Sequence, residues 1–151
     1  MAKISAKQMQ SRLQQVANQR WLENQVHEII LSDQDKLKER KVNEFTKGQR
    51  PDGERIGKYR NAEYGIFKAQ INPLANGYVD LLLTRSFTRK MFLRKFGQGY
   101  LFNSSDNKTG NLIGKYGIDI MGINQEWFNE RQKNIYKYIL LFDISKILNK
   151  K

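Results

Sequence analysis

A metal-dependent nuclease needs carboxylates that bind its metal ion, and this chain has five candidates spread along it: Glu44, Asp52, Glu63, Asp80 and Asp119. Paired carboxylates bind a divalent cation or act as general acid and base only where the fold brings them together. Their spacing in this sequence gives no sign of such a meeting. We therefore expect no enzyme, no catalytic residue and no metal site, and keep a metal-dependent nuclease as a third hypothesis.

Other residue types that carry chemistry are scarce. His27 is the only histidine and there is no cysteine, which excludes disulfides, thiolate chemistry and cysteine-containing zinc sites. Two Gly-x-x-Ile-Gly-Lys-Tyr strings, ending at Tyr59 and Tyr116, partly resemble a phosphate-binding loop. They have one residue too few between the glycines, and tyrosine stands where the magnesium-binding hydroxyl is needed. We expect no cofactor.

The polar segment 103–110 contains oxygen-bearing side chains around Asp106. It does not fit a calcium loop, because Lys108 occupies the third ligand position. This pattern predicts an exposed, solvated turn.

The strongest candidate for binding is the segment 84–100, which carries five cations and no anion: Arg85, Arg89, Lys90, Arg94 and Lys95. Aromatic residues alternate with them: Phe87, Phe92, Phe96 and Tyr100. If residues 85–91 are helical, Arg85 and Arg89 share one face, and three or four cations beside a phosphate backbone give sequence-independent, salt-dependent affinity. The alternative is a solvated face over a core formed by the three phenylalanines. The cations are thus a candidate patch for nucleic acid or for an acidic protein partner.

Composition sets the broad class. The chain has 151 residues, 39% of them hydrophobic, and a net charge of +12. The apolar content is enough for a core, and the charge is typical of a protein that contacts a polyanion or an acidic surface. The first residues lack the apolar stretch of a signal peptide, and the longest apolar run, residues 138–142, is far shorter than the roughly 20 residues that span a bilayer. We expect no membrane contact.

Apolar spacing predicts helices at both ends. Residues 6–31 show helical periodicity. The sequence Ser32-Asp-Gln-Asp35 either caps a second helix that reaches about Phe45 or lies on the surface of one continuous helix. Asn124 is a suitable cap for the final helix, whose wide apolar face covers the sheet or forms an oligomer contact.

The middle of the chain predicts short strands. Loops are expected at 48–57 and 72–77, a strand at 78–84 with Asp80 on a face near solvent, and a β-hairpin formed by 92–96 and 100–103 around Gly97 and Gly99. The predicted fold is α+β, a small antiparallel sheet with long N-terminal and C-terminal helices. We divide it into an N-terminal helical segment (1–47), a loop and sheet core (48–123) and a C-terminal helix packed on that core (124–151), as a single domain overall.

From Gly53 to about Trp127 the chain resembles small virion proteins of tailed bacteriophages, of the minor head–tail joining or tail-completion type. The residues that carry the resemblance are Asp52-Gly53, Ile56-Gly57-Lys58-Tyr59, and the segments 79–84, 85–88, 106–109 and 115–122. The chain departs from the pattern at Arg85, where the family often has Gly or Asp.

The resemblance implies a structural protein with no catalytic residues to carry over. Such proteins form rings between the portal and the tail or at the tail's upper end, with neighbouring subunits as partners and DNA passing through the lumen. The expected function is thus a virion component made in the host cytoplasm, a homo-oligomer contacting portal, neck or tail subunits and genomic DNA. The alternative is a sequence-independent nucleic-acid-binding protein that uses the basic segment.

Overall fold

The chain is described by a computed structural model covering residues 4–82 and 84–150. It combines helices with one two-stranded antiparallel sheet, so the predicted α+β class is confirmed. The chain forms two compact units. Unit 1 comprises Met1–Asp33 and Glu126–Lys151, and unit 2 comprises Gln34–Gln125.

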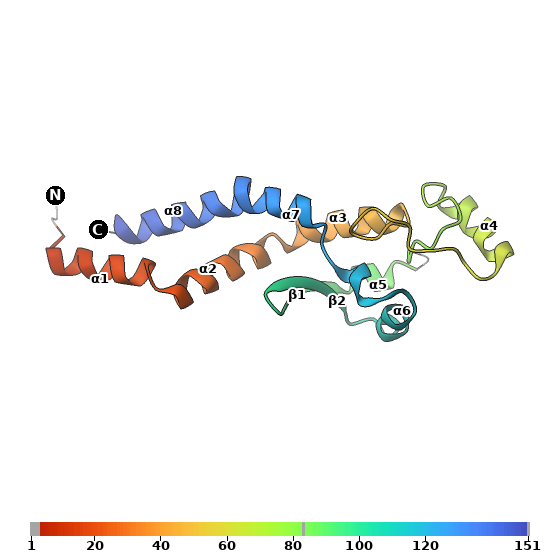
Figure 1. Cartoon of the computed structure of the whole chain (residues 1–151), viewed down its shortest axis with the longest axis horizontal. Coiled ribbons are helices and arrows are strands. Elements are labelled where there is room, and N and C mark those ends of the chain that lie inside the picture. The colour runs from red at the N-terminus through yellow and green to blue at the C-terminus, as the bar shows by residue number, and fades with distance from the viewer. Residues whose placement is uncertain (1–3, 83, 151) are drawn as a thin grey trace. The chain divides into compact units, whose positions relative to one another are not determined.

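Unit 1 is helical. Its elements are α1 (Ala6–Val16), α2 (Gln19–Ser32), α7 (Gln125–Arg131), a π-helical turn η2 (Gln132–Tyr136) and α8 (Lys137–Leu148). Within this unit, α8 packs along α1 and α2 (Figure 1). The division expected from the sequence placed the C-terminal helix on the sheet core, and the contacts of α8 with α1 and α2 are those that it makes within its own unit.

Local capping breaks the helical stretch expected at 6–31 into two helices. Ser5 and Gln8 form a capping box at the start of α1, and the Asn18 side chain accepts a hydrogen bond from the Trp21 amide at 2.9 Å to start α2. The helix is interrupted at Asp33, between α2 and α3. Of the two alternatives at 32–35, a separate second helix and one continuous helix, the separate helix is therefore confirmed. Ser32 does not cap it, because its hydroxyl donates back to the carbonyl of Ile29 at 2.6 Å.

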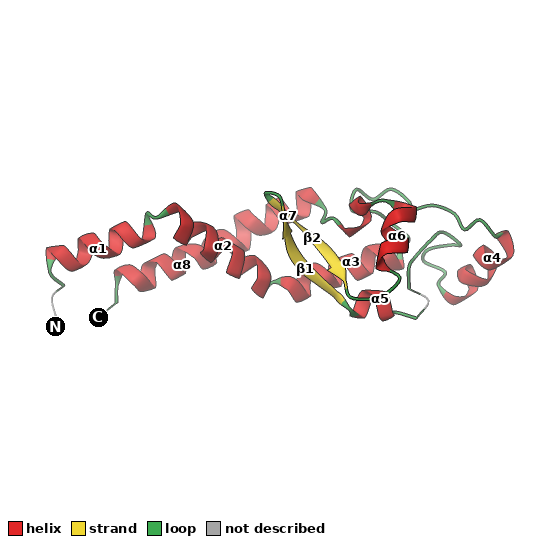
Figure 2. Cartoon of the chain, turned by 90° about the horizontal axis from the view of Figure 1, so that it is seen from below, coloured by secondary structure: helices red, strands yellow, loops and turns green. Residues whose placement is uncertain are grey.

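Unit 2 contains the sheet. Its elements are α3 (Gln34–Thr46), α4 (Ala62–Ile71), α5 (Ser86–Arg89), β1 (Met91–Phe96), β2 (Gly99–Ser104), α6 (Thr109–Tyr116) and a 3-10 turn η1 (Ile118–Met121). The predicted hairpin is confirmed, with Met91 opposite Ser104 and Phe96 opposite Gly99. The hairpin packs along α3 (Figure 2), and Phe45, Leu93 and Phe102 lie in the buried core.

The strand expected at 78–84 is wrong for the residues that the structure describes there; Leu83 lies outside them. Tyr78 makes a single bridge with Lys58, and Leu81 has a left-handed backbone with φ 55°. The cause is Asp80, whose carboxylate accepts the Leu82 amide at 3.2 Å and bends the chain. Asp80 also does not face solvent, because it is 1% exposed.

Candidate functional site

The five cations of the basic segment lie at exposed positions in α5, in β1 and at the two ends of α5, and the helical face expected for Arg85 and Arg89 does not form. Arg85 precedes α5 with φ 56°, outside the helix, so it does not share a helix face with Arg89. The Arg89 guanidinium donates to the Thr84 carbonyl at 3.3 Å, and the Lys90 ammonium lies 3.6 Å from Asp106. Arg94 and Lys95 are adjacent in β1 and therefore point to opposite faces.

The aromatic residues of this segment divide between the core and the surface. Phe87 is buried, whereas Phe92 and Phe96 are 41% and 51% exposed. The alternative interpretation, a core of all three rings, is therefore wrong for two of them. The buried residues of β1 are Met91 and Leu93, so strand alternation places Phe92, Arg94 and Phe96 together on the outer face.

Asp106 is the centre of a buried polar cluster. Its side chain accepts from the Ser86 hydroxyl at 2.6 Å and from the Lys108 amide at 3.0 Å, and it is 7% exposed. The hydrogen bond from Ser86 lowers the pKa of Asp106 most, and the Lys108 amide lowers it further. The expected solvated turn is thus wrong at this residue, because local hydroxyl and amide donors replace water.

A second cluster surrounds Asp80. One carboxylate oxygen lies 2.8 Å from the Lys68 ammonium, and the other accepts from the Asn72 amide at 2.9 Å. Both charged side chains are at most 2% exposed. Burial opposes the charged carboxylate, but the hydrogen bonds from Lys68 and Asn72 outweigh it, so the pKa of Asp80 is lowered. Burial also raises the pKa of Tyr59, whose hydroxyl lies 3.3 Å from Asp80.

The other carboxylates considered for a metal site are not gathered around one point. Glu44 binds Lys41 at 2.7 Å, and Asp119 binds Arg50 at 2.7 Å, in separate ion pairs. Burial lowers the pKa of Lys41 despite its contact with Glu44. Across residues 4–82 and 84–150, no three His, Asp or Glu side chains are grouped as metal ligands.

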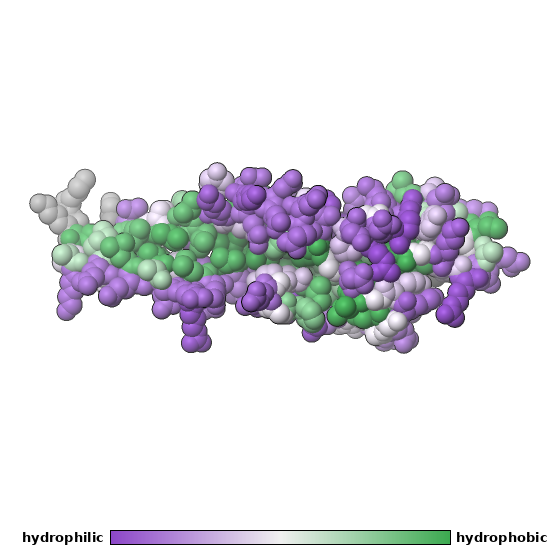
Figure 3. All heavy atoms as spheres, viewed as in Figure 1, coloured by the Kyte–Doolittle hydropathy of each residue, from purple (hydrophilic) through white to green (hydrophobic). Residues whose placement is uncertain are grey.

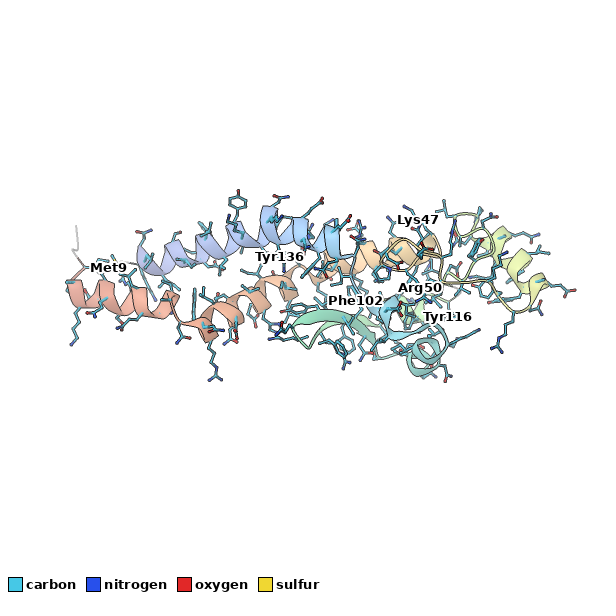
Figure 4. The ribbon with its side chains drawn as sticks, viewed as in Figure 1. Met9, Lys47, Arg50, Phe102, Tyr116 and Tyr136 are labelled. Carbon is cyan, nitrogen blue, oxygen red and sulfur yellow. The ribbon has the colours of Figure 1, made fainter. Side chains whose placement is uncertain are left out.

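In unit 1 a charged cluster joins helices that are distant in sequence. The Arg131 guanidinium makes two hydrogen bonds to Asp33, at 2.6 and 2.7 Å, and Tyr136 donates to the same carboxylate at 2.5 Å. Figure 4 shows Tyr136 directed from η2 toward α2. The hydrogen bond to Asp33 raises the pKa of Arg131, and burial raises the pKa of Tyr136. The cluster stabilises the pairing of these helices.

Unit 2 has a cavity of about 190 Å³ beside the Lys68–Asp80 pair. Its walls are mostly aromatic and aliphatic and include Tyr59, Tyr64, Leu82, Phe87, Leu112 and Tyr116. The ammonium of Lys68 is held by Asp80, so it is not offered as a nucleophile or as an anion site. The cavity has room for an apolar group.

The most distinctive surface of unit 1 is the outer face of α8, formed by Tyr138, Leu141 and Phe142. These side chains are 62%, 50% and 62% exposed. Along the described part of the chain, α1 and α8 contain no buried side chain, although α8 is rich in apolar residues and α1 has a narrow apolar stripe that includes Met9 and Leu13. Figure 3 shows the resulting hydrophobic band over α1 and α8.

Unit 2 has a comparable apolar surface on and after α4, which we call the α4 surface: Ile66, Phe67, Ile71 and Leu74. These side chains are 47–63% exposed. The sequence analysis missed this helix. Asn61, whose side chain accepts from the Tyr64 amide at 3.0 Å, and Glu63 in the first turn were the start signals that would have found it.

No protein-family model, no curated protein and no solved structure matches the chain. Among the described helices, none is both long and apolar enough to cross a membrane.

Proposed function

We propose that this protein is a structural component of a tailed-phage virion, a subunit of an oligomeric ring in the neck or the upper tail. Its partners are copies of itself and portal, neck or tail subunits. The observation that carries the proposal is the apolar outer face of α8. The apolar face of an amphipathic helix is normally buried, and a contiguous exposed apolar patch marks an interaction site.

The residues that carry the resemblance to phage virion proteins support this assignment. They belong to unit 2, where Ile56, Val79 and Met121 are buried. Asp106 of the same unit accepts a hydrogen bond from the Ser86 hydroxyl. These positions maintain a scaffold, as expected of a structural protein. The 17 basic and 9 acidic residues of unit 2, against 10 and 6 in unit 1, give a positive surface suited to DNA or to an acidic neighbouring ring.

Detection in purified particles is the test of this function. Antibody labelling or mass spectrometry of phage particles should find the protein at several copies per particle. Co-sedimentation with portal and neck proteins should move it to a faster-sedimenting species. Absence from particles, together with no association with these proteins, would contradict the proposal.

A second candidate, sequence-independent binding of nucleic acid, is favoured by one observation on the hairpin. Phe92, Arg94 and Phe96 share the outer face of β1, and the Arg94 guanidinium lies 5.9 Å from the Phe96 ring centroid. Exposed rings beside cations are the arrangement on which single-stranded bases stack.

A salt titration with single-stranded and double-stranded DNA decides this candidate. Four phosphate contacts predict that log K falls with log salt with a slope of about −3. Changing Arg85, Arg89, Lys90 and Arg94 together to Ala should abolish that slope. The matched control removes four exposed cations elsewhere: Lys7, Arg20, Lys133 and Lys150. Equal losses in both variants would leave only a general charge effect and would contradict a specific patch.

A further inference from the structure

We propose that the α4 surface of one copy packs against the outer face of α8 of the next copy, in a head-to-tail contact. The inference deepens the proposed function and rests on it, because it names the two surfaces through which the ring would assemble. The occupant of each surface is therefore a second copy of this chain.

The α4 surface has the character of a buried element without cover in its own unit. Ile66 and Leu74 are 63% and 62% exposed, and Phe67 and Ile71 are 47% and 53% exposed. The helix contains two charged residues, and one of them, Lys68, is buried against Asp80. Glu63 is therefore the charge that α4 presents to solvent.

The outer face of α8 has the opposite charge at its edges. Tyr138, Leu141 and Phe142 lie at i, i+3 and i+4, on one side of the helix, and Lys137 and Lys146 flank them. The carboxylate of α8, Asp143, lies 3.0 Å from Lys146 and is partly covered. Glu63 of one copy can therefore form an ion pair with Lys137 or Lys146 of the next. The α4 surface also borders a cation, because Lys58 lines the same hollow as Ile66, so the favourable charge contribution is limited to that one pair.

The exposed apolar area is close to what a stable contact needs. A large side chain contributes on the order of 200 Å², so the four half-exposed side chains of the α4 surface give on the order of 450 Å² and the three of the outer face of α8 on the order of 350 Å². A standard interface needs about 800 Å² per partner, of which about 60% is apolar. The two surfaces therefore supply most of the apolar area that each partner in such an interface contributes.

Charge and symmetry favour this pairing over contact between like surfaces. Two α8 faces packed together would bring the lysines of both copies close to one another, whereas α4 against α8 lets Glu63 pair with one of them. Contact between different surfaces is heterologous, and such contacts close into rings when the rotation between copies allows it. This is the form of assembly that a connector requires.

Mixing two variants tests the pairing. The first carries Phe67→Lys and Ile71→Lys on α4, and the second carries Tyr138→Lys and Leu141→Lys on α8. All four replacements are lysine, so a changed surface cannot bind an intact one, and two changed surfaces repel each other. Only an intact α4 surface and an intact α8 face can bind. The wild-type chain should self-associate in sedimentation velocity, and each variant alone should be monomeric. An equimolar mixture of the two should form a 1:1 heterodimer and nothing larger. A control with Gln98→Lys and Asn107→Lys, two exposed polar positions, adds the same charge and should assemble like the wild type.

Several outcomes overturn the inference. These are a monomeric wild type, an α4 variant that assembles like the wild type, an α8 variant that does so, or a mixture without a heterodimer. A dimeric α4 variant beside a monomeric α8 variant would instead assign the contact to two α8 faces.

A second measurement is available if either variant fails to fold by circular dichroism. The chain has no cysteine, so single Ile71→Cys and Leu141→Cys variants, mixed under oxidation, should give mainly the mixed disulfide. Equal or lower yield than with Gln98→Cys in place of Ile71→Cys would also overturn the inference. If the protein is present in particles but the α4 and α8 surfaces do not bind each other, only this inference is contradicted. If the two surfaces bind each other but the protein is absent from particles, only the proposed function is contradicted.

Discussion

Units 1 and 2 differ in how completely they bury their apolar side chains. Unit 2 surrounds its ion pairs and polar clusters with a core that includes Phe45, Val79 and Phe102, each at most 2% exposed. Unit 1 has few fully buried side chains among its described residues, and its two terminal helices keep their apolar side chains partly in water. In the assembly that we propose, unit 1 gains its remaining burial from another copy, and unit 2, whose core is otherwise complete, covers its α4 surface in the same contact.

The largest expected effect comes from the buried pair of unit 2. Asp80→Ala leaves the Lys68 ammonium buried without a partner, which should lower the free energy of unfolding by about 3–5 kcal/mol. Both tryptophans, Trp21 and Trp127, belong to unit 1. In urea, the far-UV circular dichroism should therefore show an earlier transition while tryptophan fluorescence changes little.

The double variant Lys68→Met with Asp80→Asn is the control, because it leaves no charge in the buried site and keeps an oxygen acceptor. It should recover part of the lost stability. A double variant as unstable as Asp80→Ala would show that the charge of Lys68 is not the cause.

The hairpin offers a matched pair of substitutions on one strand. Leu93→Ala removes a side chain that is 5% exposed and should cost about 2–5 kcal/mol. Phe92→Ala, on the opposite face, should change stability by less than about 0.5 kcal/mol. Thermal unfolding followed by circular dichroism distinguishes them. Comparable losses at the two positions would mean that the outer face of β1 is not free of packing.

The features that were predictable from the sequence are those fixed by neighbouring residues, and those that were missed depend on contacts between residues far apart in the chain. The hairpin at 91–104 and the terminal helices follow from alternation, glycine positions and helical spacing, all of which are local. The expected strand at 78–84 failed because the Asp80 carboxylate accepts the Leu82 amide and turns the chain. The burial of that carboxylate depends on Lys68, 12 residues earlier, and such a contact leaves no local pattern. The exposure of Phe92 and Phe96 was missed for the same reason, since strand alternation does not tell which face is inside.

In unit 1 the corresponding test is Asp33→Asn. Removing the charge weakens the two hydrogen bonds from Arg131 and should cost about 2 kcal/mol. The loss should appear in the tryptophan fluorescence transition. Glu28→Gln, an exposed carboxylate in the same unit, should leave the transition unchanged. If both changes have the same effect, the cluster at Asp33 does not hold the helices together.

The smallest expected effect is the loss of folding stability at low pH. Asp80 and Asp106 have pKa values lowered from the ordinary 3.8 in the folded chain, so the unfolded chain binds more protons over that range. Their stabilising contribution is present above about pH 4 and is lost as the pH falls through the folded-state pKa values. Unfolding in urea from pH 6 to pH 3 should show this loss, and Asp106→Asn should reduce it. A wild-type stability that is flat over this range would contradict the lowered pKa values.

Sedimentation equilibrium of the full chain tests the contrast between the two units most directly, with the Tyr138→Lys and Leu141→Lys double variant measured alongside. We expect the wild type to exceed the mass of one chain and the variant to return to that mass while unit 2 stays folded. A wild type with the mass of one chain, and with unit 1 folded by tryptophan fluorescence, would contradict the claim that another copy completes unit 1.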